Sequence, residues 1–217
     1  MNENEKQLNE ILHIFDDEGV LPNLVLIGSW SLLFYKHLFD DFIPSVRTTD
    51  VDFYVPDVKR IKAKSGLINS FKELNYDIIN DTLTHKSTFI SPDGFELEFL
   101  TKLTRQQLSC VKLGNTDIYA ESIPFLDFFQ SGYVEIKYDN LNVKVASPSS
   151  YVLQKLLINS KRKEKREKDI DSIKMVLSYI MASKKYSDDL KNELNALPNK
   201  WKKTIIKVAE ENNIKLF

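Results

Sequence analysis

Residues 24–31 of the chain read LVLIGSWS, and residues 50–55 read DVDFYV. The apolar run of the first stretch is typical of a short buried strand, and the Gly-Ser pair that follows it marks a turn into a helix. The second stretch predicts another strand. Because alternate residues of a strand point to the same face, Asp50 and Asp52 are expected to lie side by side on it.

The two stretches carry complementary groups for binding a metal ion and a phosphate. Two adjacent carboxylates repel each other unless a cation lies between them, and oxygen-only ligands favour Mg²⁺ or Mn²⁺ over zinc. At the turn, Gly28 lets the backbone approach a bulky anion, the next helix offers unpaired N–H groups, and Ser29 adds a hydroxyl. Each feature alone is common as plain structure, but this order and spacing indicate phosphoryl or nucleotidyl transfer.

The whole sequence predicts an α+β fold, with a mixed β-sheet and flanking helices followed by a C-terminal helical bundle. The pattern changes to helix near Pro148, which divides the chain into an α/β domain over residues 1–147 and a helical domain over residues 148–217. Strands are expected at 24–27, 51–55, 86–90, 95–100, 111–113, 117–120, 133–137 and 141–145, and helices at 4–18, 30–39, 57–74, 124–129, 151–158, 170–180, 187–197 and 199–211.

Two motifs carry a resemblance to a known family. Residues 26–32, LIGSWSL, and residues 47–52, RTTDVD, resemble the nucleotidyltransferases of the DNA polymerase β superfamily, whose pattern is a Gly-Ser turn, an Asp-x-Asp pair and a later third carboxylate. They are most similar to the bacterial branch that contains the abortive-infection toxins of type IV toxin–antitoxin systems. The similarity extends well over residues 20–100 and loosely over the remainder. It implies a nucleotidyltransferase-like sheet in the first domain.

The resemblance also implies a third carboxylate on a neighbouring strand. Residues 95–100 read FELEFL, so that Glu96 and Glu98 share one face of this strand. We favour Glu98, because the third acid of the family usually precedes two apolar residues, and Glu96 is the alternative. By resemblance, Asp50, Asp52 and Glu98 would be catalytic and would hold two Mg²⁺ or Mn²⁺ ions. A solvated strand face is the competing interpretation of the two glutamates.

Further residues are implied as nucleotide-binding. Lys155 would contact the triphosphate of a nucleoside triphosphate (NTP), and Lys168 or Asp169 would hold or activate the acceptor. Residues 161–168 are strongly basic, and they fit either cations for a triphosphate or a solvated helix surface. The full nucleotide-binding set expected is Gly28, Ser29, Arg47, Thr49, Lys155, Lys168 and Asp169.

Composition limits the class of protein. The chain has 217 residues, 42% of them hydrophobic and 11% aromatic, which is enough apolar material for a packed core. No apolar run approaches the roughly 20 residues of a membrane helix, and the polar N-terminus lacks the features of a secretory signal. The single cysteine, Cys110, cannot form an internal disulfide. We therefore expect a cytoplasmic protein with no membrane partner.

Charge is distributed unevenly along the chain. Residues 155–217 contain 16 lysines and arginines against 9 aspartates and glutamates, whereas residues 1–154 contain 14 against 22. This asymmetry suggests an anion bound between the two parts, although mutual attraction of the two parts explains it equally well. The acceptor is left open among RNA, a protein hydroxyl and a small molecule.

Two functions follow from these observations. The first is metal-dependent transfer of a nucleoside monophosphate from an NTP to a hydroxyl acceptor, with release of pyrophosphate. The alternative is a non-catalytic member of a toxin–antitoxin pair that binds a nucleotide or a cognate antitoxin. The clustered carboxylates favour the enzyme, because a binding-only protein gains nothing from keeping like charges together.

Overall fold

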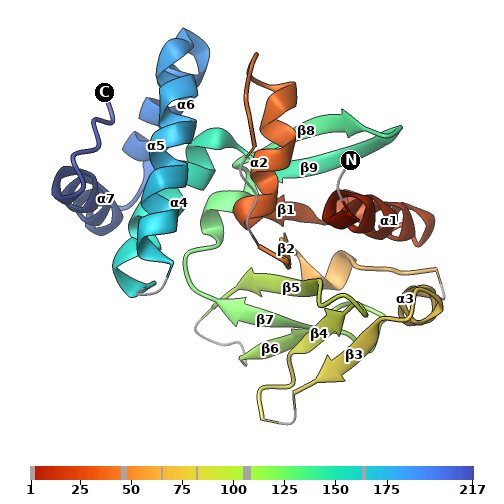
Figure 1. Ribbon diagram of the computed structural model, residues 1–217. Helices are drawn as coiled ribbons and strands as arrows, with labels where there is room; N and C mark the ends of the chain where they lie inside the picture. The colour runs from red at the N-terminus through yellow and green to blue at the C-terminus, as the bar shows by residue number, and fades with distance from the viewer. Residues whose placement is uncertain (1–2, 45–47, 65, 82, 105–108, 163–164) are drawn as a thin grey trace.

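The computed structural model describes residues 3–44, 48–64, 66–81, 83–104, 109–162 and 165–217. Within these ranges, nine strands form one mixed sheet (Figure 1). The strands are β1 (Val25–Ile27), β2 (Asp50–Tyr54), β3 (Asp77–Asn80), β4 (Ser87–Ile90), β5 (Glu96–Lys102), β6 (Cys110–Lys112), β7 (Tyr119–Ile123), β8 (Tyr133–Tyr138) and β9 (Leu141–Ala146). The α+β fold expected from the sequence is confirmed.

The sheet has the order β3-β4-β5-β2-β1-β9-β8, and the β6–β7 pair extends it beside β5. Strand β2 lies at the centre, antiparallel to β1 and parallel to β5. The β8–β9 hairpin turns at Asp139 and Asn140, whose φ angles of 45° and 65° are those of a tight two-residue hairpin turn. This order places the Gly-Ser turn after β1 directly beside the Asp-x-Asp strand.

One face of the sheet is covered by α1 (Glu3–Asp17) and α3 (Leu67–Glu73). The helical spacing of α1 buries Leu8, Ile11, Leu12 and Phe15 on a single stripe. The Phe15 ring meets Phe53 of β2 edge to face, with 5.0 Å between ring centroids. Since Phe53 and Val51 turn to this side, the intervening aspartates of β2 face the opposite side.

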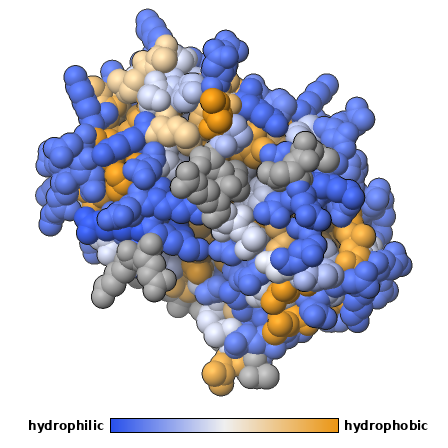
Figure 2. All heavy atoms as spheres, in the orientation of Figure 1, coloured by the Kyte–Doolittle hydropathy of each residue, from blue (hydrophilic) through white to orange (hydrophobic). Residues whose placement is uncertain are grey.

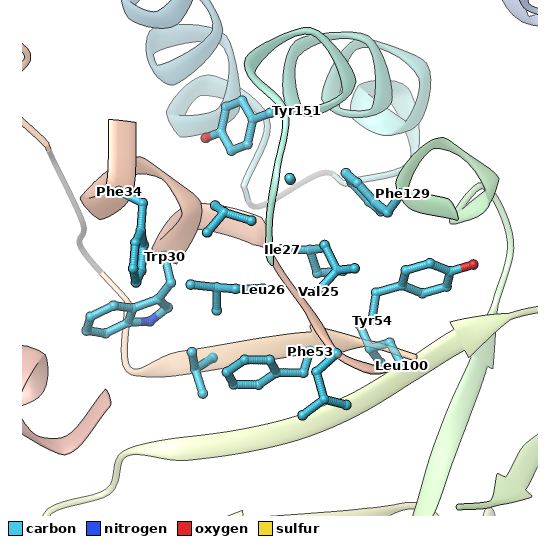
Figure 3. Close-up of a cluster of buried hydrophobic side chains, with 14 of the residues drawn as sticks. Val25, Leu26, Ile27, Trp30, Phe34, Phe53, Tyr54, Leu100, Phe129 and Tyr151 are labelled. Carbon is cyan, nitrogen blue, oxygen red and sulfur yellow. The ribbon is translucent and has the colours of Figure 1, made fainter. Parts of the chain in front are cut away.

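The C-terminal part consists of α4 (Pro148–Ile158), α5 (Arg166–Ala182), α6 (Lys184–Ala196) and α7 (Asn199–Glu211). Ser147 caps α4 by accepting a hydrogen bond from the N–H of Ser150. Buried side chains of α4 join those of β1, β2 and β5 in one apolar cluster, with Tyr151 of α4 and Phe129 near Ile27 of β1 (Figure 3). The chain therefore changes from strands to helices near Pro148, as the sequence indicates, although α4, α5 and α6 each begin three or four residues earlier than expected. The division into domains 1–147 and 148–217 stays a prediction.

Three expected helices are shorter in the structure. The one expected over residues 124–129 is only a 3₁₀ turn, Asp127–Gln130. Residues 28–30 and 35–37 are 3₁₀ turns around a short α2 (Ser31–Phe34), so the segment is not one continuous helix. The helix expected over residues 57–74 is broken: Asp57 caps only a 3₁₀ turn, and α3 begins at Leu67. The side chain of Asn115 bonds both backbone groups of Ala63 at 3.0 and 2.9 Å, which holds the break in an extended conformation.

Strand β3 was not expected, because its residues are mostly exposed and show no alternation of polar and apolar side chains. It pairs with β4 at the edge of the sheet, where such a strand needs only one partner. On the face seen in Figure 2, hydrophilic residues cover most of the surface. No helix in the described ranges is long and apolar enough to cross a membrane.

Candidate active site

A cleft of about 450 Å³ lies between the sheet and the C-terminal helices. The strand ends of β1, β2, β5 and β7 form its floor, and α4 with the segment that follows it forms the opposite wall. The floor consists of Ile27, Gly28, Asp50, Asp52, Glu96, Glu98, Leu100 and Glu121. The wall consists of Tyr151, Gln154, Lys155, Ile158, Lys161, Arg162 and Lys165. The side between them consists of Ile123, Pro124, Phe125, Leu126 and Phe129.

Strand register brings the acidic residues of the floor together. In the parallel β2–β5 pair, Asp50 lies opposite Glu96 and Asp52 lies opposite Glu98. The side chains alternate with buried apolar residues on both strands, so all four carboxylates face the cleft. Glu121 joins them from β7.

Asp52 is the acid of the floor that lies next to the Gly28 turn. Burial raises the pKa of Asp52 to about 6, and the charges of Glu98 and Asp50 act in the same direction. Gly28 has a φ of +71°, and a Cβ atom there would lie 3.1 Å from Oδ2 of Asp52. A side chain at position 28 would therefore strain the backbone and crowd the carboxylate that the turn approaches.

Two lysines contact the acidic floor from opposite sides. Lys165 places its Nζ 3.1 Å from Oδ2 of Asp50. Lys86, the residue before β4, lies 2.7 Å from Oε1 of Glu98 and 3.5 Å from Oε2 of Glu121. Burial lowers the pKa of Lys86, but the two glutamates outweigh it and the net pKa is raised.

A buried ion pair joins α4 to α5 in the helical wall. Nζ of Lys155 lies 2.5 Å from Oδ1 of Asp169, and each residue is only 3% exposed. Arg162 approaches the other carboxylate oxygen of Asp169 at 3.4 Å. Burial lowers the pKa of Lys155, while Asp169 opposes this shift. Two cations on one carboxylate leave net positive charge in this wall, beside the acidic floor.

Lys161 of the wall contacts Phe125, which lies on the side between the wall and the floor. Nζ of Lys161 lies over the Phe125 ring at 4.3 Å from its centroid, a cation–π contact. The basic segment that follows α4 is thus divided in position: Lys161, Arg162 and Lys165 line the cleft, whereas Arg166 is exposed outside it. That the cleft residues of this segment serve as cations for a triphosphate stays a prediction.

Not all expected site residues lie in this cleft. Gly28, Lys155 and the acidic residues line it, whereas Ser29 and Lys168 line a neighbouring cavity of about 400 Å³. Thr49 is exposed, and its carbonyl accepts a hydrogen bond from the N–H of Glu96 that sets the β2–β5 register. Arg47 lies outside the described residues.

Sequence reasoning missed Lys86 and Glu121 and did not single out Arg162 or Lys165. Glu121 belongs to β7, which joins β5 from further along the chain, and Lys86 precedes β4, which forms a hairpin with β5; no motif connects either residue to Asp52. One signal was present, because Glu121 alternates with the buried Ala120 and Ser122 as Glu98 does with its neighbours. Lys165 lay within the basic run, but nothing local distinguished it from Arg166.

The donor set fits a hard divalent cation at one position of the floor. Asp50 and Asp52 offer oxygen atoms on one face. The raised pKa of Asp52 means that its negative charge is unfavourable in this site, and a bound cation would offset that charge. Within the described ranges, however, no three acidic, histidine or cysteine side chains converge closely enough to hold an ion together. The carboxylate of Glu98 is directed to Lys86 instead.

Two solved structures are similar to this chain, and the first of them shows a shared fold. An antigenic nucleotidyltransferase-like protein from Paracoccidioides brasiliensis matches 94% of this chain and 88% of its own, at 15% identity and a TM-score of 0.51. ANT(2″)-Ia in complex with adenylyl-2″-tobramycin matches 95% of this chain and 97% of its own, at 12% identity and a TM-score of 0.49. No curated protein matches the chain.

The family model described as Nucleotidyltransferase matches residues 6–197, which include every cleft residue named above. That description names no toxin, so the resemblance to the abortive-infection branch and a cognate antitoxin stay predictions. Because the match extends over most of the chain, from α1 through α6, the chain belongs to the nucleotidyltransferase family and is an enzyme of that class.

Proposed function

We propose that this enzyme transfers a nucleoside monophosphate from an NTP to a hydroxyl group of an acceptor and releases pyrophosphate. The observation that carries the proposal is the register of β2 and β5, which sets Asp50, Asp52 and Glu98 on one floor beside the Gly28 turn. Family membership supplies the reaction class, and the cleft supplies the residues that perform it.

Asp50 and Asp52 would hold Mg²⁺ or Mn²⁺. When bound, such an ion supplies positive charge that neutralises the carboxylates and the transferring phosphate. Burial and the neighbouring acids make the negative charge of Asp52 unfavourable, so a bound cation would stabilise its ionised form. Lys165 is half exposed and has room to move from Asp50 toward the phosphates of the substrate.

The phosphate end of the NTP would lie between the Gly28 turn and the helical wall. Gly28 permits close approach of the backbone, and Arg162 and Lys165 provide cations on the facing side. A triphosphate carries about four negative charges, which Asp50 and Asp52 alone would repel. Lys155, already paired with Asp169, would hold α4 and α5 together behind these cations and add to their positive field.

The acceptor hydroxyl would enter from the β5 side. Its oxygen attacks the α-phosphorus, the bond from that phosphorus to the bridging oxygen of the β-phosphate breaks, and pyrophosphate leaves. The hydroxyl proton passes to the carboxylate of Glu98, which stands beside Asp52 in the register. Glu98 suits this role better than Glu96, because the charge of Glu98 acts directly on Asp52 whereas Glu96 lies opposite Asp50.

The proposal is tested with NTPs labelled on either the α- or the γ-phosphate, incubated with Mg²⁺ and separated RNA, protein and metabolite fractions. We expect the α-label on the acceptor and the γ-label in pyrophosphate. The Asp50→Asn variant should lose transfer, and Asp117→Asn, which alters an exposed ion pair with Lys112, should retain it. Transfer of the γ-label to the acceptor would contradict the proposal.

A further inference from the structure

Lys86 is fixed in place by the strands around it. Its carbonyl accepts a hydrogen bond from the N–H of Asp81 at 2.9 Å. The next residue, Ser87, is fully buried and bonds both Asn80 and the N–H of Tyr119. The ammonium group of Lys86 thus extends from a hydrogen-bonded backbone to the carboxylate of Glu98 in the cleft floor, and its side chain is 25% exposed.

The ammonium group bridges two carboxylates of the acidic floor. It donates to Oε1 of Glu98 at 2.7 Å and lies 3.5 Å from Oε2 of Glu121. The hydroxyl of Thr88 also reaches Oε1 of Glu98, at 3.4 Å. A charge-assisted bond of this length fixes the glutamate and neutralises it without any other cation.

A divalent ion bound to Glu98 would meet this ammonium group at close range. The two cations would repel each other, and moving Lys86 away would leave Glu121 without its ion pair. Asp50 and Asp52 differ in this respect. Asp50 pairs with the half-exposed Lys165, and within the described residues no cation lies at ion-pair distance from Asp52.

We propose that Lys86 takes the place of a second divalent ion in this active site. The enzyme then binds one divalent ion with its NTP, at Asp50 and Asp52, while Lys86 holds Glu98 in position for the acceptor hydroxyl. This revises the two ions expected from the family resemblance. The inference rests on the proposed function, and Lys86 acts as a positioning residue, since it reaches the reaction through Glu98.

The test counts the Mn²⁺ ions bound for each bound nucleotide. The chain is dialysed to equilibrium at pH 8 against Mn²⁺ and a non-hydrolysable NTP analogue, and both are measured on each side of the membrane. We expect one ion per nucleotide in the wild type and two in Lys86→Met, because removing the ammonium group frees Glu98 and Glu121. Lys112→Met removes a lysine with a similar ion pair outside the cleft and should keep one ion.

Two ions in the wild type would overturn the proposal and leave the proposed function standing. One ion in a folded Lys86→Met variant would also overturn it. If that variant fails to fold, as judged by its thermal melting, the wild-type count decides alone. Absence of nucleotide-dependent Mn²⁺ binding in the wild type would instead contradict the proposed function, and the inference with it.

Discussion

On the sheet side of the cleft, acidic side chains are placed by strand register, whereas on the helical side basic side chains are placed by ion pairs between helices. Asp52 and Glu98 face each other because their strands pair residue for residue. Lys155 and Arg162 hold their positions through one buried carboxylate, Asp169. The first arrangement depends on backbone hydrogen bonds, so single side-chain changes should leave it folded. The second depends on side-chain charge, so single changes should disturb it.

The largest expected effect of this difference is on the helical side. Asp169→Asn would leave the buried Lys155 without its counter-charge, and breaking a buried pair in this way costs about 3 kcal/mol in the free energy of unfolding. Urea denaturation at pH 7 measures it. Asp50→Asn, on the sheet side, should change the free energy of unfolding by less than about 1 kcal/mol, since its ion pair with Lys165 is half exposed. Equal losses in both variants would break the distinction.

A second prediction concerns Glu193 on α6, which accepts a hydrogen bond from Ser150 in the first turn of α4. Burial raises the pKa of Glu193 to about 7, and the charge of Asp189 acts in the same direction. Ionising this group in the folded protein costs free energy. Its contribution to stability is therefore complete below pH 4.5 and is lost as the pH rises through about 7.

Glu193→Gln removes this titration. We expect the variant to gain roughly 2 kcal/mol relative to the wild type between pH 4.5 and pH 8, measured by thermal or urea unfolding at several pH values. The exposed Asp188→Asn serves as the control and should follow the wild-type profile. Parallel profiles for the wild type and Glu193→Gln would show that support of the helical wall does not depend on this carboxyl group.

The smallest expected effect is at Lys165, where the two sides of the cleft touch. Lys165→Met should weaken binding of a non-hydrolysable NTP analogue by about fivefold, or about 1 kcal/mol, because a half-exposed cation is partly screened by water. Titration calorimetry at two salt concentrations measures it, and the loss should shrink at high salt. Lys207→Met, in an exposed ion pair on α7, should leave binding unchanged. A loss of affinity that does not depend on salt would contradict this prediction, because it would mean that Lys165 binds the nucleotide in a site closed to solvent.

Much of the sheet side could be predicted from the sequence, because its pattern is local. Alternation within DVDFYV and FELEFL determines which residues face the cleft, and pairing of the two strands then aligns them. The helices of the helical side could also be predicted. For example, α7 begins at Asn199, directly after Pro198, as expected. The ion pairs between these helices were not predictable, since they depend on how α4 and α5 pack.

Where the sequence misled, longer-range contacts were responsible. The helix expected after Asp57 gives way to an extended segment because Asn115, far along the chain, bonds the backbone of Ala63. Lys86 was missed for another reason: the β4–β5 hairpin that brings it to Glu98 was expected, but its neighbours in sequence do not mark it as a partner of that glutamate. Such contacts carry no periodic signal, so they become visible only in the folded structure.

The proposed mechanism requires the carboxylates of β2 and β5 to act as one catalytic unit. A double-mutant cycle on the rate of pyrophosphate release tests it most directly, with Asp52→Asn, Glu98→Gln and the combined variant measured under identical conditions with NTP and acceptor. Each single variant is predicted to lose roughly a thousandfold or more in rate, and the combined variant little beyond the worse of the two. Losses that multiply in the combined variant, or a single variant that keeps the wild-type rate, would contradict it.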